Sequence, residues 1–194
     1  MIKNWLLLLE YVKFKGRIFM NYNTRGLIDK IANGVLNDYN IEVPIKDMQK
    51  VIQELGGQLK VSDNVVDGKI EKDPDKGIFI ISIKNGEFNS PRNRFTIAHE
   101  LGHLFLHMGY GSSYWDTQST ESYQRLGTSK DESEANEFAA AFLMPEALYK
   151  SKIWDLGINN DGIHQVNIEK IADFFKVSTL AAVNRGKFLG VFEW

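Results

Sequence analysis

Two histidines and a glutamate with the spacing of a metal site lie in one short stretch of the chain. Residues 98–103 read AHELGH, inside an apolar segment with helical spacing. On a helix, residues four positions apart share one face, so the His99 and His103 imidazoles can bind the same cation. Glu100 is then placed to take a proton from a water molecule that the cation activates. The pattern predicts a zinc peptidase.

The rest of the ligand set has to come from another segment. The chain contains no cysteine, so a metal ion must be held by His, Asp or Glu. A catalytic zinc usually takes three protein ligands and leaves one position for water. Glu132 is the favoured third ligand, because Asn136 follows on the same helix face and can fix the tautomer of a ligating histidine. Glu134 is the alternative ligand.

Two further histidines are weaker candidates. His107 continues the spacing of four residues from His103. Each such step overshoots a full helical turn by about 40°, so a straight helix does not easily bring three successive rings to one ion. We therefore expect His107 to be a partly buried or solvated residue near the helix end, and it stays a secondary ligand candidate. His164 is remote in sequence, and is either an ordinary loop histidine or a donor that stabilises the oxyanion.

The two segments that carry these residues have clear helix signals. Ser90 and Pro91 predict the start of the motif helix, which should end near Gly109. The Glu132 segment predicts a helix over residues 131–144, with acidic residues in its first turn that suit the helix dipole. Gly102 lowers helix propensity by about 1 kcal/mol relative to alanine, which suggests close approach of a neighbouring element. An alternative without metal, a polar patch on an amphipathic helix, fits the apolar flanks of the motif poorly.

The remaining apolar patterns predict an α+β fold. They are, in chain order, helices over 24–38 and from about Pro44 to Gly56, β-prone runs at 58–62, 65–71 and 77–83, and closing helices at 167–175 and 178–187. We expect a small zincin-like domain in which a short, mostly antiparallel sheet of about three strands packs on the HExxH helix, with further helices around it.

A polar stretch separates the two helices of the site. Residues 111–130 are rich in Ser, Thr and Tyr and long enough to form a lid or a loop that contacts substrate. Four aromatic side chains could contact substrate there or simply anchor the loop on the domain. These are Tyr110, Tyr114, Trp115 and Tyr123.

Length and composition indicate one ordinary globular domain. The chain has 194 residues, of which 43% are hydrophobic and 12% aromatic, enough for one sizeable core. We expect residues 24–194 to form that domain with a C-terminal helical segment, and residues 1–23 to be an N-terminal extension, with Met20 as an alternative natural start. The apolar run near the N-terminus breaks at Glu10 and is too short for a membrane span or a signal sequence.

The charge balance limits the classes of partner. The chain has 23 basic and 25 acidic residues and a net charge of −2, which argues against a broad polyanion-binding surface. We therefore expect neither direct nucleic-acid binding nor membrane binding. The absence of cysteine fits a reducing cytoplasm, where we expect the protein to act.

Several motifs together resemble those of the ImmA/IrrE-type metallopeptidases. The matching motifs are RFTIAHELGH from Arg94, a histidine at 107, ESEANEFA from Glu132, and LMP ending at Pro145. The resemblance implies a minimal gluzincin-like fold and a zinc ion on His99, His103 and Glu132. It also implies a typical role, the intracellular cleavage of helix-turn-helix repressors that control mobile elements, phage or stress genes.

The C-terminal part leaves a competing interpretation open. Residues 168–178 resemble the family's closing segment and also the first half of a helix-turn-helix, but the next helix carries only Arg185 and Lys187 as basic side chains. Residues 188–194 are apolar and should pack on the domain. The leading hypothesis is a zinc endopeptidase that cuts such a repressor. The alternative is a metal-containing regulatory module that binds a repressor or DNA without cleavage, and an intact Glu100 favours the enzyme.

Overall fold

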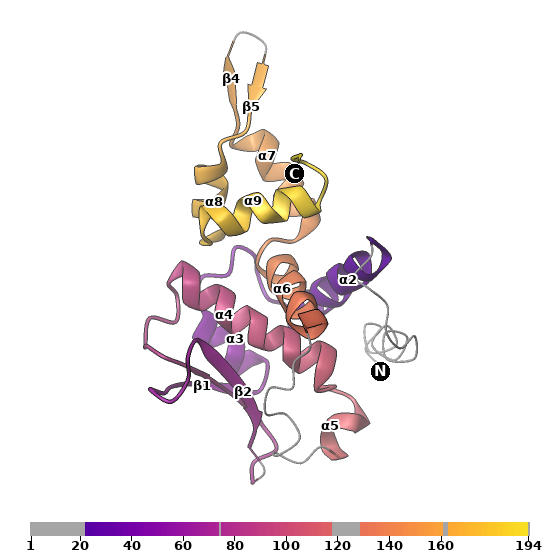
Figure 1. The fold of residues 1–194 in the computed structure, drawn as a ribbon, viewed down its shortest axis with the longest axis vertical. Coiled ribbons are helices and arrows are strands. Elements are labelled where there is room, and N and C mark those ends of the chain that lie inside the picture. Colours follow the sequence, from indigo (N-terminus) through magenta and orange to yellow (C-terminus); the bar gives the residue numbers. More distant parts are fainter. Residues whose placement is uncertain (1–21, 74, 118–128, 161–162, 194) are drawn as a thin grey trace.

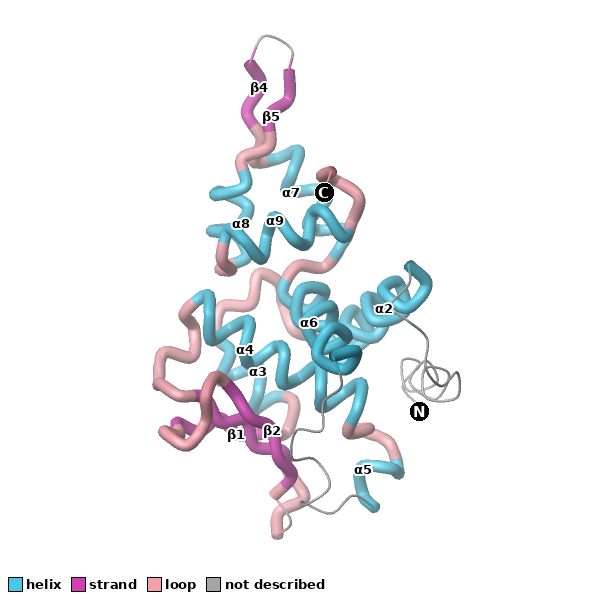
Figure 2. Tube along the Cα trace, viewed as in Figure 1, coloured by secondary structure: helices cyan, strands magenta, loops and turns pink. Residues whose placement is uncertain are grey.

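The computed structural model describes residues 22–73, 75–117, 129–160 and 163–193. Within these ranges the protein has the predicted α+β architecture, with a small sheet and helices around it (Figures 1 and 2). No helix in the described ranges is long and apolar enough to cross a bilayer. The predicted extension at 1–23 falls almost entirely outside the described residues.

The sheet contains three strands and is mixed. Its members are β1 (Gly57–Val61), β2 (Gly68–Lys72) and β3 (Phe79–Ile83), in the order β1-β3-β2. The central strand β3 pairs in parallel with β1 and antiparallel with β2, whereas the sequence predicts a mostly antiparallel sheet. Strand spacing does not encode which strand lies in the middle. The apolar run of β3 does indicate its place, because all five of its residues are buried.

Two helices precede the sheet. Helix α2 (Tyr22–Asp38) matches the prediction within two residues and packs against the later helix α6 (Ser129–Leu143). Helix α3 (Met48–Glu54) begins later than expected from Pro44, because the Asp47 side chain accepts hydrogen bonds from the first backbone N–H groups of the helix. Helix α3 packs beside β1.

The motif helix changes pitch in its second half. Helix α4 (Pro91–Gly102) begins as predicted, with the Ser90 hydroxyl accepting from the Asn93 N–H and Pro91 in the first turn. It continues as a π-helical turn, η1 (His103–His107), in which the Met108 N–H donates to the His103 carbonyl at 3.0 Å. A π turn rotates the chain less per residue than an α turn. His107 therefore returns towards the face of His103 instead of drifting away from it.

Helix α6 lies against α4 with almost no side chain between the two backbones. A Cβ on Gly102 would lie 2.8 Å from the Ala135 Cα and 2.9 Å from the Ala135 carbonyl oxygen. This confirms the close approach that a glycine inside the motif helix predicts. The contact brings the first turn of α6, which carries Glu132, over the two histidines.

The C-terminal part forms the opposite end of the molecule from the three-stranded sheet (Figure 1). It contains α7 (Glu146–Asp155), the hairpin β4 (Ile158–Asn160) and β5 (Ile163–Gln165), α8 (Ile168–Phe175) and α9 (Thr179–Phe188). The sequence predicts α8 and α9 but not α7, which buries only Tyr149 and Ile153 and so has no long apolar stripe. Val191 and Phe192 pack on the core, as predicted for the closing segment.

A buried arginine ties this end to the rest of the fold. Arg185 of α9 is 1% exposed and donates hydrogen bonds to Asp29 Oδ1 at 2.7 Å and to Glu137 Oε1 at 3.2 Å. Its Nε also donates to the Met144 carbonyl at 3.0 Å. One side chain thus joins α9 to α2 and α6.

Candidate metal centre

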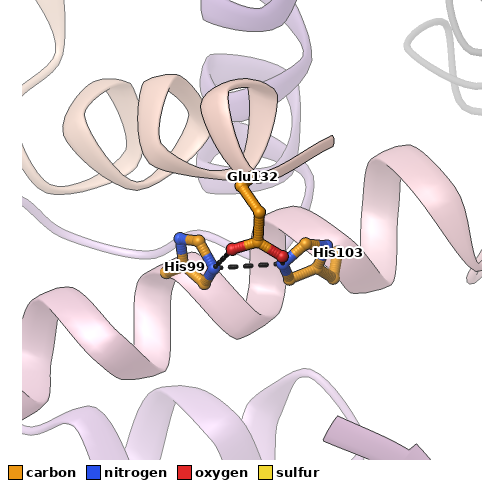
Figure 3. Close-up of side chains that lie close together, drawn as sticks. All are labelled: His99, His103 and Glu132. Atoms are coloured by element: carbon orange, nitrogen blue, oxygen red, sulfur yellow. Dashed lines mark hydrogen bonds and ion pairs between the residues drawn. The ribbon is translucent and has the colours of Figure 1, made fainter. Parts of the chain in front are cut away.

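Three side chains from two helices converge on one point (Figure 3). The Nε2 atoms of His99 and His103, both on the motif helix, lie 3.0 Å apart. Glu132 of α6 reaches them from the other side, with one carboxylate oxygen 3.2 Å from His99 Nε2 and the other 3.5 Å from His103 Nε2. The structure therefore assembles the same three residues that the sequence favours.

The separations suit one small cation. Ligand atoms bound tetrahedrally at about 2.0–2.1 Å from zinc lie about 3.3 Å from one another, close to the 3.0, 3.2 and 3.5 Å found among these atoms. The three distances join four atoms, the two Nε2 nitrogens and the two oxygens of one carboxylate, and one divalent cation can bind both rings and the carboxylate together. Two imidazole nitrogens and a carboxylate are also a donor set that zinc accepts.

The centre is open on the side of the carboxylate. The Glu132 side chain is 47% exposed, while those of His99 and His103 are 16% and 13% exposed. Water and a substrate can therefore approach past Glu132. The histidines are held by the helices around them.

Asn136 fixes the direction of the first histidine. The Asn136 Oδ1 lies 2.9 Å from His99 Nδ1. An amide oxygen only accepts, so His99 donates from Nδ1 and its Nε2 lone pair faces the centre. Asn136 follows Glu132 by one helical turn, so α6 brings both residues to the same histidine.

Glu100 lies beside the sheet and is 6% exposed. A Cβ on Gly68 of β2 would lie 2.8 Å from Glu100 Oε1 and 2.6 Å from Thr96 Cγ2. The backbone of β2 can therefore lie against the Glu100 carboxylate only because residue 68 lacks a side chain. Gly68 was not among the residues predicted for the site, although a glycine inside a β-prone run is a known signal of close backbone approach.

The secondary ligand candidates lie outside the group of three. His107 turns its Nδ1 towards His103 Nδ1, at 3.0 Å, and its Nε2 towards Glu134 Oε2, at 3.2 Å. Glu134 thus faces His107 and not the centre. The backbone of His164 lies in β5, in the hairpin at the far end of the molecule from α4 (Figure 1), so this arrangement does not support a role for His164 at the oxyanion.

The start of the polar stretch 111–130 is anchored on the domain. The Tyr110 hydroxyl donates to the Leu55 carbonyl at 2.6 Å, and burial raises the pKa of Tyr110 to about 12. Trp115 lies in the short helix α5 (Ser113–Thr117), is buried, and donates from Nε1 to the Gly77 carbonyl at 3.3 Å. Tyr114 is 45% exposed. Tyr123 and residues 118–128 of the predicted lid or substrate-contacting loop fall outside the described residues.

The chain belongs to a known metallopeptidase family. Residues 73–187 match the model of the IrrE N-terminal-like domain family, Peptidase M78. The match covers more than half of the chain and includes both helices of the candidate centre. It is the family that the sequence motifs resemble.

The chain is also similar to a solved structure, at low sequence identity. One similar structure is described as a Mycobacterium tuberculosis transcriptional regulator. It is 16% identical, with a TM-score of 0.49, and the alignment covers 94% of this chain and 51% of that one. The chain thus spans about half the length of that protein. No match was found among curated proteins.

Proposed function

We propose that the protein is a zinc-dependent endopeptidase of the cytoplasm, with zinc held by His99, His103 and Glu132. The observation that carries this proposal is the convergence of two imidazole nitrogens and one carboxylate, whose contacts measure 3.0, 3.2 and 3.5 Å. Zinc bound there would supply Lewis acidity, which activates water and polarises the carbonyl of the bond to be cut. Membership of the Peptidase M78 family supports the same activity.

Glu100 is the proposed general base. It follows the first ligand directly in the chain, and its carboxylate is held between α4 and the glycine of β2. It takes a proton from the attacking water and passes it to the leaving amide nitrogen. Burial against Gly68 and Thr96 limits the rotamers of Glu100, which keeps the carboxylate ready for both transfers.

The proposed substrate is a helix-turn-helix repressor cut at one accessible site. The resemblance to ImmA/IrrE-type peptidases supplies this class of partner. Strand β2 supplies a way to bind an extended segment, because in the described residues it pairs with β3 only and runs past Glu100. A peptide that adds to a sheet edge gains backbone hydrogen bonds without losing side-chain selectivity.

The mechanism is tested with Glu100→Gln. The amide keeps the size of the side chain but cannot accept the proton, so we expect turnover to fall by about 10²–10⁴-fold while zinc stays bound. Zinc content is measured by metal analysis, and cleavage by mass spectrometry. Equal cleavage by the wild type and by Glu100→Gln would rule out this mechanism.

Substrate choice is tested by offering two proteins to both forms of the enzyme. A helix-turn-helix repressor encoded near this gene should be cut at one site, and unfolded casein should remain largely intact. Rapid multi-site digestion of casein beside an intact repressor would contradict the proposed specificity. Repressor binding by both forms without any cleavage would instead favour the non-proteolytic regulatory module.

A further inference from the structure

A second line of contacts leads away from the metal centre through His103. Its Nδ1 atom lies 3.0 Å from His107 Nδ1, and His107 Nε2 lies 3.2 Å from Glu134 Oε2. The Glu134 side chain is 6% exposed, and its other oxygen lies 3.4 Å from the Lys130 ammonium. The chain of contacts therefore begins at a candidate ligand and ends on a buried carboxylate with its own counterion.

The proton positions along this line follow from the ligand role of His103. An imidazole that binds a metal through Nε2 carries its proton on Nδ1. His103 Nδ1–H then donates a hydrogen bond to His107 Nδ1. His107 therefore carries its own proton on Nε2, which faces Glu134. A carboxylate is the acceptor that this second N–H needs.

We infer that His107 and Glu134 are positioning residues, which orient His103 and strengthen it as a zinc ligand through a His103–His107–Glu134 hydrogen-bond relay. This inference rests on the proposed zinc site. A carboxylate at the end of such a relay makes the ligating imidazole more basic, and loss of partners of this kind typically weakens metal binding by about 10–100-fold. At the other histidine, His99, the neutral amide of Asn136 lies in the corresponding place.

The π-helical turn is what makes the relay geometrically feasible. In a continuous α-helix, His107 would be rotated about 40° beyond His103 around the axis. In η1 it instead presents a ring nitrogen to His103 and still reaches α6. Single π turns inside α-helices are often found at functional sites.

A second metal ion is the competing explanation for these residues. His107, Asp131 and Glu134 place three donor atoms within 4.8 Å of one another. If His107 and His103 each bound a metal through Nε2, both Nδ1 atoms would carry protons and would face each other at 3.0 Å. The Lys130 ammonium beside Glu134 would also repel a cation. Both arguments favour the relay.

The relay is tested by zinc affinity, measured by competition with a chromogenic chelator on the full chain. His107→Phe keeps an aromatic ring but removes the relay, and we expect zinc to bind about 10–100-fold more weakly. His107→Gln should restore most of the affinity, because its amide can accept from His103 and donate to Glu134. Glu134→Leu should weaken zinc binding in the same range. Circular dichroism and thermal melting of the metal-free proteins check that each variant is folded.

Asp131→Asn is the matched control. Asp131 lies 4.0 Å from His107 Nε2, too far for a hydrogen bond, so the relay does not need it and the affinity should stay within about twofold. Unchanged affinity in folded His107→Phe and Glu134→Leu would overturn the relay. Two zinc ions per wild-type molecule, with one lost in Asp131→Asn, would overturn it in favour of a second metal site. A wild type that binds no zinc would reject the proposed centre itself, before any variant is compared.

Discussion

Two groups of ionisable side chains, one at the candidate metal centre and one under α9, each contain at least one acidic side chain, but they differ in how the negative charge is compensated. Asp29 and Glu137 are brought together by α2 and α6, and Arg185 lies between them with a side chain that is 1% exposed. His99, His103 and Glu132 are brought together by the motif helix and α6, and the two Nε2 atoms and the carboxylate oxygens face one another.

The two clusters differ in whether the structure itself places a cation beside the acidic side chains. The Arg185 cluster contains its own cation and is closed to solvent. Arg25, 3.8 Å from Glu137, adds a second positive charge at its edge. The histidine cluster is open beside Glu132, and under the proposed function it takes its cation from solution. We therefore expect substitutions in the Arg185 cluster to change stability and substitutions in the histidine cluster to change metal binding.

The largest expected effect is loss of the metal from the histidine cluster. The purified wild type should hold about one zinc per molecule, and alanine at His99, His103 or Glu132 should abolish this, because each supplies one of three protein ligands. Zinc at about 100 times its dissociation constant should stabilise the wild type by about 2.7 kcal/mol and leave these variants unchanged. Metal analysis and thermal melting measure both effects. Full zinc in Glu132→Ala, with loss in Glu134→Ala or His107→Ala, would show that the third ligand is wrongly assigned.

Substitutions in the Arg185 cluster should lower the free energy of unfolding and leave the zinc content unchanged. Arg185→Met leaves Asp29 and Glu137 buried without their cation, and we expect the free energy of unfolding to fall by about 3–5 kcal/mol. Folded molecules of this variant should still bind one zinc. Urea titration measures the loss, and adding Asp29→Asn and Glu137→Gln to Arg185→Met should recover part of it. A loss below about 1 kcal/mol would mean that Arg185 is not the cation on which this cluster depends.

The helix contact next to the metal centre should show an intermediate effect. Gly102→Ala places a Cβ 2.8 Å from the Ala135 Cα, so α6 must move, at a cost of about 1–3 kcal/mol. Because Glu132 is part of α6 and would move with it, zinc affinity should fall too. Gly26→Ala is the matched control, since a Cβ there meets nothing within 4 Å and alanine in a helix interior should add about 0.5–1 kcal/mol. Equal stability of the two variants, measured by urea titration, would contradict the close contact.

The smallest effect concerns pH. Burial raises the pKa of the Asp29 carboxyl above its usual range, with Arg185 opposing the shift, and burial likewise raises the pKa of Glu137. A raised folded-state pKa gives stability that is present at low pH and lost as pH rises through that value. Wild type should therefore gain stability relative to Asp29→Asn as the pH is lowered from neutral into the acid range. Urea titrations at several pH values test the sign, and a gain in the opposite direction would mean that the Arg185 attraction outweighs burial.

Much of the fold and of the centre follows from local patterns. The Ser90 cap, the proline at the helix start and the apolar spacing predict α4, and the same reasoning finds α2, α6 and the three strands within a few residues. Gly102 predicts a close backbone contact, although it does not reveal that Ala135 is the neighbour. These signals work because capping, turn and helical-face preferences act between residues that are near in sequence.

Other features depend on contacts between distant segments. The pairing of β1 with β3 is parallel, and no local pattern specifies that neighbour or direction. The short helix α7 is shaped by packing, as its few buried residues indicate. The ion pair of Arg185 with Asp29 joins residues 156 positions apart, and Arg185 looks from the sequence like one of two basic residues on a terminal helix.

The same distinction between local patterns and contacts of distant segments applies to the candidate metal centre. The sequence by itself determined the types of ligand and the spacing of His99 and His103, because both lie on one helix whose geometry is local. The sequence favoured Glu132 and left Glu134 as the alternative, whereas the tertiary structure places Glu132 beside the histidine pair and Glu134 beside His107, because of how α6 crosses α4. The π-helical turn that aims His107 is likewise unmarked in the sequence. Its one extra residue per turn is accommodated by packing between α4, η1 and α6, and such packing exists only once the chain has folded.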